Sequence, residues 1–112
     1  MGFRIVPTPE FVKQTKKLSK KYPQLRQDLT SLQNILQDNP KDGTHLGDNC
    51  YKIRLQNMSA KRGKRGGFRV IIFLIEEDKM IRLLAIYSKS EKDNIADEEI
   101  KKILKKNNLV KS

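Results

Sequence analysis

Acidic residues are missing from the middle of this 112-residue chain, since no aspartate or glutamate occurs from Asn49 to Ile75. The same stretch carries seven basic residues: Lys52, Arg54, Lys61, Arg62, Lys64, Arg65 and Arg69. The whole chain has 24 lysines and arginines against 13 acidic residues, which gives a net charge of +11. Such an excess favours a polyanionic partner, either nucleic acid or an acidic protein. A charge run is equally typical of a solvated surface, so this pattern leaves both interpretations open.

Cysteine, histidine and long apolar runs are scarce as well. The single cysteine, Cys50, excludes an internal disulfide, and one histidine with one cysteine does not form a zinc motif. The longest apolar run, residues 70–75, is too short to span a bilayer, and the first ten residues lack the apolar core of a secretory signal. We expect one domain over residues 1–112 in the reducing cytoplasm, without membrane, metal or small-molecule cofactor.

The amino-terminal part predicts a short strand followed by two amphipathic helices. Residues 3–6 have strand character, and Pro7 ends them. Thr8 and Pro9 are typical of a helix cap and first helical position, and apolar residues recur at helical spacing up to Tyr22. A second helix, which ends at residues 39–40, has leucines at every third or fourth position: Leu25, Leu29, Leu32 and Leu36. The two helices together predict a helical hairpin.

The carboxyl-terminal part predicts three strands and a last helix. Residues 41–49 are rich in Gly, Asp and Asn and predict a loop. Residues 51–56 alternate apolar and polar, as in a half-buried strand, and residues 68–76 and 80–87 predict two further strands of an antiparallel meander. Residues 96–107 place acids before lysines, which suits the helix dipole. The predicted fold is α+β, in the order β-α-α-β-β-β-α.

Alternation within residues 51–56 places Lys52 and Arg54 on the same face of their strand, about 6 to 7 Å apart. Arg69 lies near the start of the next strand and can join them. If the helical hairpin covers the apolar face of the sheet, these cations line the uncovered face and form a trough for a phosphodiester backbone. The alternative is that they only keep the sheet soluble.

Three motifs occur in an order that resembles a known family. They are CYKIRL at residues 50–55, GFRVIIF at 67–73 and LLAIYSKSEKDNI at 83–95. With the predicted order of elements, they resemble the RelE/ParE superfamily of toxins from type II toxin–antitoxin systems, over nearly the whole chain. Residues 61–71 followed by 83–91 are most similar to its HigB-like, RelE-type branch.

The resemblance implies a ribosome-dependent, metal-independent mRNA endoribonuclease (mRNA interferase) that inhibits translation in the cytoplasm. The implied partners are mRNA, ribosomal RNA and a cognate antitoxin protein. Two other functions stay open at this point. One is a ParE-like toxin that inhibits gyrase without nuclease activity, and the other is an RNA-binding module without catalysis.

The resemblance also implies roles for individual residues. Lys52 and Arg54 would supply a general base and charge stabilisation, and Arg69 would hold the scissile phosphate. Because an arginine does not lose its proton in proteins, Lys52 is the better candidate for the base. RelE carries an arginine near Ser90 and a tyrosine near Ala96, and this chain has neither.

Other residues near the end of the last strand are candidates for the missing functions. Tyr87, Lys89 and Lys92 could supply stacking and charge, although Tyr87 is equally consistent with a packed strand-end aromatic. We expect the predicted connector to contribute sequence-independent phosphate contacts from four residues: Lys61, Arg62, Lys64 and Arg65. His45 falls in the predicted loop without a ligand partner, and Cys50 is expected to be a small buried residue.

Overall fold

The computed structural model describes residues 2–57 and 67–110. Its elements are β1 (Arg4–Pro7), α1 (Pro9–Lys21), α2 (Leu25–Asp38), β2 (Thr44–Gly47), β3 (Cys50–Leu55), β4 (Phe68–Ile75), β5 (Met80–Ser88) and α3 (Asp97–Lys106). The predicted α+β class is confirmed, and the predicted elements lie within two residues of the observed ones. Within the described ranges, no helix is both long and apolar enough to cross a bilayer.

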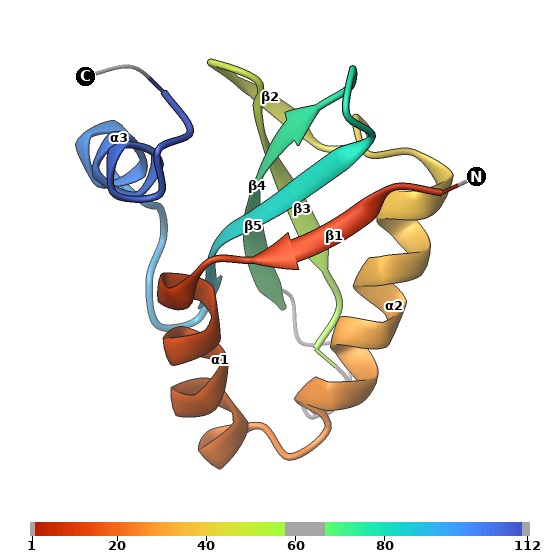
Figure 1. Ribbon diagram of the computed structural model, residues 1–112. Coiled ribbons are helices and arrows are strands. Elements are labelled where there is room, and N and C mark those ends of the chain that lie inside the picture. The colour runs from red at the N-terminus through yellow and green to blue at the C-terminus, as the bar shows by residue number, and fades with distance from the viewer. Residues whose placement is uncertain (1, 58–66, 111–112) are drawn as a thin grey trace.

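The strands form one five-stranded sheet in the order β1-β5-β4-β3-β2 (Figure 1). β3, β4 and β5 are joined as the predicted antiparallel meander, while β1 pairs with β5 in parallel at one edge. β4 is the central strand, and its residues are mostly apolar because apolar cores form on both faces of the sheet.

The prediction of a loop over residues 41–49 is wrong in one part. Thr44–Gly47 form the edge strand β2, which pairs antiparallel with β3. The turn between them places Asp48 and Asn49 at φ values of 50° and 63°. Positive φ at both central residues is typical of a tight hairpin turn, and Asp and Asn tolerate it better than most residues. The polar pair was therefore a hairpin signal rather than a loop signal.

The helical pair covers one face of the sheet, as predicted. Thr8 caps α1, since its Oγ accepts a hydrogen bond from the Phe11 amide at 3.2 Å and donates one to the Leu83 carbonyl at 2.8 Å. α1 and α2 bury their apolar sides in a core with alternate residues of β3, β4 and β5. The helix residues of this core are Phe11, Leu25, Leu32 and Leu36. Fully burying one leucine contributes about 1.5 to 3 kcal/mol, so this layer fixes the sheet against the helices.

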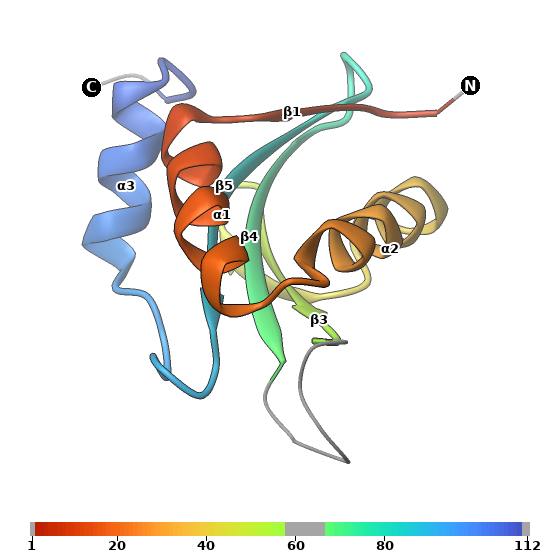
Figure 2. The ribbon, with the colours of Figure 1, turned by 90° about the horizontal axis from the view of Figure 1, so that it is seen from below.

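The prediction that the second face of the sheet is uncovered needs correction. α3 lies on the side of the sheet opposite α2 (Figure 2). Its Ile100, Ile103 and Leu104 form a second core with residues of β3, β4 and β5, among them Phe73 and Tyr87. The apolar residues that the sequence places on both faces of β4 explain this cover, because they would otherwise face water. Only part of the second face is left for polar side chains.

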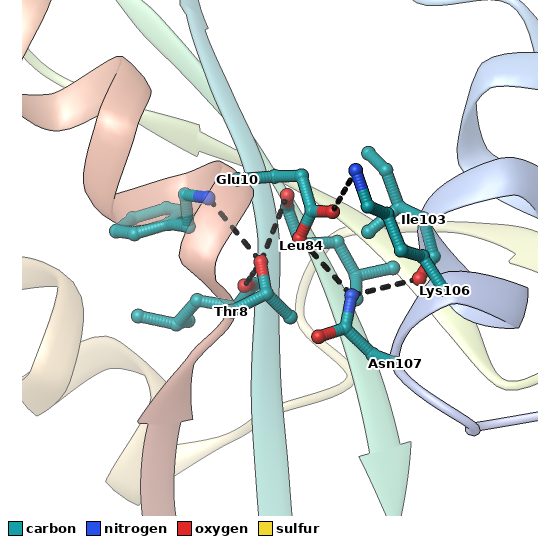
Figure 3. A network of polar contacts seen from close by, with 8 residues as sticks. Thr8, Glu10, Leu84, Ile103, Lys106 and Asn107 are labelled. Atoms are coloured by element: carbon teal, nitrogen blue, oxygen red, sulfur yellow. Dashed lines mark hydrogen bonds and ion pairs between the residues drawn. The ribbon is translucent and has the colours of Figure 1, made fainter.

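A polar network joins the start of α1 to the end of α3 (Figure 3). The Asn107 amide donates to a Glu10 oxygen at 3.0 Å and to the Ile103 carbonyl at 2.8 Å, and Lys106 Nζ lies 4.0 Å from the other Glu10 oxygen. Burial alone would raise the pKa of Glu10. The hydrogen bond from Asn107 and the charge of Lys106 are among the opposing effects that outweigh burial, so the pKa of Glu10 is lowered.

Replacing Glu10 with glutamine is expected to remove a small, pH-dependent part of the stability. Because folding lowers the pKa of Glu10, its ionised form stabilises the fold above the ordinary value of 4.5, and this contribution disappears as the pH falls through the lowered value. We expect a loss of less than about 1 kcal/mol at pH 7, which vanishes in acid. Urea unfolding at pH 7 and pH 3 measures it. Glu77→Gln, in the exposed β4–β5 turn, is the control, and an equal loss at both pH values would contradict the prediction.

Candidate functional site

Cationic side chains lie in register on adjacent strands of the second sheet face. Arg54 on β3 pairs with Arg69 on β4, and Arg69 pairs with Tyr87 on β5. Side chains of directly paired residues are neighbours, with Cβ atoms about 5 Å apart. Lys52 lies two residues before Arg54 on the same strand and pairs with Thr44 of β2. The register thus brings together Lys52, Arg54 and Arg69, as the sequence predicted.

These residues line a polar concavity of about 530 Å³, which we call the cationic pocket. Its lining is Asp42, Gly43, Thr44, Lys52, Arg54, Arg69, Lys89 and Asp93. Four of the five catalytic candidates from the sequence therefore share one pocket, at the part of the face that α3 does not cover. A concave site with convergent cations is the geometry expected for an anionic ligand.

Arg69 is more deeply buried than the other cations of the pocket. It is 9% exposed, and its Nη1 donates to the Phe68 carbonyl at 3.3 Å. Arg54, in contrast, is exposed, and Lys52 is half-buried. Buried cations are held by their surroundings, so Arg69 is suited to a fixed contact, and the other two can adjust to a ligand.

Tyr87 does not line the pocket. It is 7% exposed and belongs to the second core, with Ile95, Ile100 and Ile103. Burial raises the pKa of Tyr87, and the charge of Arg69 offsets only part of that rise. Among the described residues, its buried hydroxyl has no hydrogen-bond partner. This placement matches the packed strand-end aromatic that the sequence left open, with Arg69 as its partner on the neighbouring strand.

Lys89 enters the pocket from the loop after β5. Its backbone amide donates to the Gly67 carbonyl at 2.9 Å, and its Nζ lies 3.4 Å from a carboxylate oxygen of Asp93. The hydroxyls of Ser88 and Ser90, on either side of it, share a hydrogen bond of 2.9 Å. These contacts fix the backbone of Lys89 and leave its side chain in a weak, exposed ion pair that a stronger anion can displace.

The pocket is not balanced electrostatically. Within the described part of the chain, Lys52 and Arg54 form no ion pair, and Arg54 directly opposes the like-charged Arg69. Like charges opposite one another destabilise a sheet. A bound phosphate would relieve this repulsion, so the pocket is suited to an anion.

The remaining candidates lie elsewhere. Lys92 Nζ lies 5.7 Å from the centre of the Tyr87 ring and 3.4 Å from a Glu99 oxygen, outside the pocket lining. Four predicted RNA-binding residues fall outside the described residues: Lys61, Arg62, Lys64 and Arg65. His45 stacks on Tyr51 with ring centres 4.9 Å apart, and its register partner places it on the face opposite Lys52.

Cys50 is buried, as expected, and burial raises the pKa of its thiol to about 12, which leaves it unreactive at neutral pH. Across residues 2–57 and 67–110, no three His, Cys, Asp or Glu side chains gather as metal ligands would.

Sequence reasoning missed Asp42, Gly43, Thr44 and Asp93 as pocket residues. The first three precede or begin β2, which was predicted as loop, so only the hairpin pairing places them beside Lys52. Gly43 has a steric role. A Cβ atom built there would lie 2.0 Å from the Lys52 carbonyl oxygen, closer than any real contact. The chain can pass this close to Lys52 only because residue 43 has no side chain.

Replacing Gly43 with alanine is expected to destabilise the fold by about 1 to 3 kcal/mol, because the backbone of β3 must move away from the added methyl group. The shift occurs at Lys52, so we expect amide chemical shifts of β2 and β3 to change while those of α3 stay the same. Thermal unfolding and NMR spectra of the variant measure both effects. Wild-type stability with an unchanged spectrum would show that the close approach to Lys52 is not required.

Comparisons with known proteins agree with this architecture. A family model described as the RelE toxin of the RelE/RelB toxin–antitoxin system matches residues 3–111. A mutant of the E. coli toxin RelE in the free state is similar in structure, with a TM-score of 0.62 and 16% identity over 95% of this chain and 98% of that one.

Two complexes are also similar in structure. They are the intact E. coli RelBE toxin–antitoxin complex (TM-score 0.51, 20% identity, 75% of this chain and 93% of that one) and the archaeal RelE–RelB complex from Pyrococcus horikoshii OT3 (TM-score 0.51, 19% identity, 82% and 100%). At these identities the structural likeness shows the fold alone. Comparison with curated protein sequences gives no significant match.

Proposed function

The chain belongs to the RelE toxin family and is thus a toxin of a toxin–antitoxin pair, and from this premise we propose that it is a ribosome-dependent mRNA endoribonuclease that needs no metal ion. The observation that carries the proposal is the cationic pocket, which gathers Lys52, Arg54, Arg69 and Lys89. RNA cleavage without metal requires a base for the 2′-hydroxyl proton, positive charge on the phosphate and an acid for the leaving oxygen. Lysine and arginine can supply all three.

In the first half of the proposed reaction, Lys52 acts as the general base and takes the proton of the ribose 2′-hydroxyl. The freed 2′-oxygen attacks the adjacent phosphorus, and negative charge grows on the phosphate oxygens. Arg54 and Arg69 flank this position from paired strands and stabilise the added charge. Arg69 supplies the fixed contact, because it is buried and packed beside Tyr87.

In the second half, the bond between phosphorus and the 5′-oxygen breaks. The protonated amine of Lys89 gives a proton to that oxygen, after the phosphate has displaced its exposed partner Asp93. The products are a 2′,3′-cyclic phosphate on one fragment and a 5′-hydroxyl on the other. Tyr87 takes no direct part in this scheme, since it is buried away from the pocket lining.

The proposed partners follow from the same surface. A cognate antitoxin of acidic character would neutralise the pocket and exclude the messenger, so one surface serves both activity and inhibition. The similar E. coli and Pyrococcus horikoshii structures are complexes of RelE with RelB, which supports an antitoxin of that kind for this chain. Action on translating ribosomes would place the protein in the cytoplasm.

Expression of the chain in growing cells tests this proposal. Two reporter messengers, identical except that one lacks its start codon, are mapped by primer extension after induction. We expect growth arrest with cuts inside the coding region of the translated reporter and none in the untranslated one. Equal cutting of both reporters would contradict ribosome dependence, and gyrase inhibition with intact messenger would identify a ParE-like activity instead.

A further inference from the structure

Helix α1 carries a second cationic surface, away from the pocket. Four exposed lysines occur at spacings of three, four and seven residues, which places them on one face of the helix: Lys13, Lys16, Lys17 and Lys20. We call this set the lysine stripe. The opposite face of α1 is occupied by Phe11, Leu18 and Tyr22, which pack into the first core. The core thus fixes the stripe toward solvent.

The stripe has no counter-charge among the described residues. None of the four side-chain ammonium groups forms an ion pair there, and the one hydrogen bond outside the helix ladder goes from the Ser19 hydroxyl to the backbone carbonyl of Lys16. The neighbouring Lys21 differs, since it pairs with Glu91. The only acid of α1, Glu10, contacts Asn107 and Lys106 at the end of α3.

This arrangement is unfavourable for the helix itself. Like charges three or four residues apart repel one another, and the stripe contains several such pairs. α3 shows the balanced alternative, in which Asp97, Glu98 and Glu99 precede its lysines. Lys20 lies in the last turn of α1 and suits the helix dipole, but the charges of Lys13, Lys16 and Lys17 do not serve the stability of the helix. An external anion would relieve the repulsion.

The chemistry of the stripe favours a phosphate backbone. From its first to its last lysine it spans about 10 Å, and a double-stranded nucleic acid carries about six phosphate charges over that length. Lysine is depleted from the cores of protein interfaces, and Lys16 is the one stripe residue that borders the apolar groove between α1 and α2. A membrane surface is disfavoured as well, because the apolar side of α1 is already buried in the core.

The helix that carries the stripe also contacts the loop that borders the cationic pocket. The residues at the end of α1, Lys21 and Tyr22, both contact Glu91, and Tyr22 shares a hydrogen bond of 3.2 Å with Ser88. Glu91 and Ser88 belong to the segment that carries Lys89 into the cationic pocket. The carboxyl end of the helix that carries the stripe is thus joined to the loop that borders the pocket.

We propose that the lysine stripe is a second RNA-binding surface, which holds the phosphate backbone of folded RNA while the pocket holds the strand to be cut. This inference rests on the proposed function for the identity of the anion. The inference goes beyond the proposed function because the stripe binds RNA but takes no part in the chemical step.

The test compares two variants that each remove three positive charges. One carries Lys13→Gln, Lys16→Gln and Lys20→Gln on the stripe. The control carries Lys101→Gln, Lys102→Gln and Lys105→Gln, three exposed lysines of α3. Glutamine and lysine have similar helix propensity, so both helices are retained. The probe is a 2′-O-methylated RNA hairpin, which cannot be cleaved through its 2′-oxygens, and binding is followed by fluorescence anisotropy from 50 to 300 mM salt.

We expect the plot of log affinity against log salt to become shallower by about two to three for the stripe variant, because each lost phosphate contact removes about 0.7 to 0.9 from the slope. The control should change the slope by less than one. The stripe variant should also melt close to wild type, since the repulsion that it relieves offsets the loss of Lys20 from the last turn of α1. Because the hairpin is not cleaved, this result is independent of the proposed nuclease activity, whose failure would show only in cleavage.

Equal changes in slope for both variants would overturn the proposal, because they would reflect net charge alone. So would an unchanged slope in the stripe variant. Competition with polyglutamate tests whether the stripe binds an acidic protein instead of RNA. If polyglutamate displaces the hairpin from wild type at the same charge concentration as unlabelled RNA, the stripe is a surface for acidic protein and the RNA assignment is wrong.

Discussion

Replacing Arg54 with alanine is expected to lower the rate of RNA cleavage by about 10²- to 10³-fold, the loss typical when one preorganised donor to a developing charge is removed. Arg54 is exposed and forms no ion pair with described residues, so its loss should not weaken the fold. Removing it also relieves the repulsion with Arg69 on the paired strand, and the melting temperature should stay the same or rise.

The matched control is Arg26→Ala, which removes one exposed arginine from α2 outside the pocket. Single-turnover cleavage on programmed ribosomes measures both variants. We expect the control to keep wild-type activity. Full activity of the Arg54 variant, or an equal loss in the control, would show that the pocket does not stabilise the reacting phosphate.

Replacing Lys52 with arginine should inactivate the protein nearly as strongly as replacing it with alanine, by about 10²- to 10⁴-fold. Arginine keeps the positive charge but cannot accept a proton at any pH relevant to proteins. Arg54 has the opposite requirement in this scheme, because it acts only through its charge. Arg54→Lys should therefore retain much of the activity that Arg54→Ala loses.

Exchanging lysine and arginine at positions 52 and 54 distinguishes a general base from a residue that acts only through its charge. Cleavage rates of Lys52→Arg, Lys52→Ala and Arg54→Lys on the same ribosomal substrate provide the comparison, and circular dichroism confirms that each variant is folded. High activity of Lys52→Arg would show that position 52 supplies charge only. The proton would then have to go elsewhere, and the carboxylates Asp42 and Asp93 that line the pocket would be the next candidates.

Local sequence patterns predicted most of the elements correctly. Thr8 and Pro9 marked the start of α1, and the leucine spacing marked α2. The alternation around Lys52 placed it on one sheet face with Arg54, and the order of strands brought Arg69 beside them. These signals succeed because caps, helical periodicity and strand alternation depend on residues close together in the sequence.

The features that sequence reasoning missed depend on distant contacts. β2 is four residues long and lies at the sheet edge, so it is stabilised by pairing with β3 rather than by a pattern of its own. The packing of α3 over the second face was visible only indirectly, in the apolar residues on both faces of β4. The same packing buries Tyr87, a placement that strand alternation alone could not choose.

The chemical ends of RNA fragments test the central claim most directly. Translating ribosomes supplied with an end-labelled messenger are incubated with wild type or with Arg54→Ala, and the fragments are treated with enzymes that distinguish their termini. Cleavage by the pocket residues predicts a 2′,3′-cyclic phosphate and a 5′-hydroxyl at each cut, and a large loss of cuts in the variant. Fragments with 5′-phosphate ends, or cuts that persist undiminished in the variant, would contradict cleavage by this pocket.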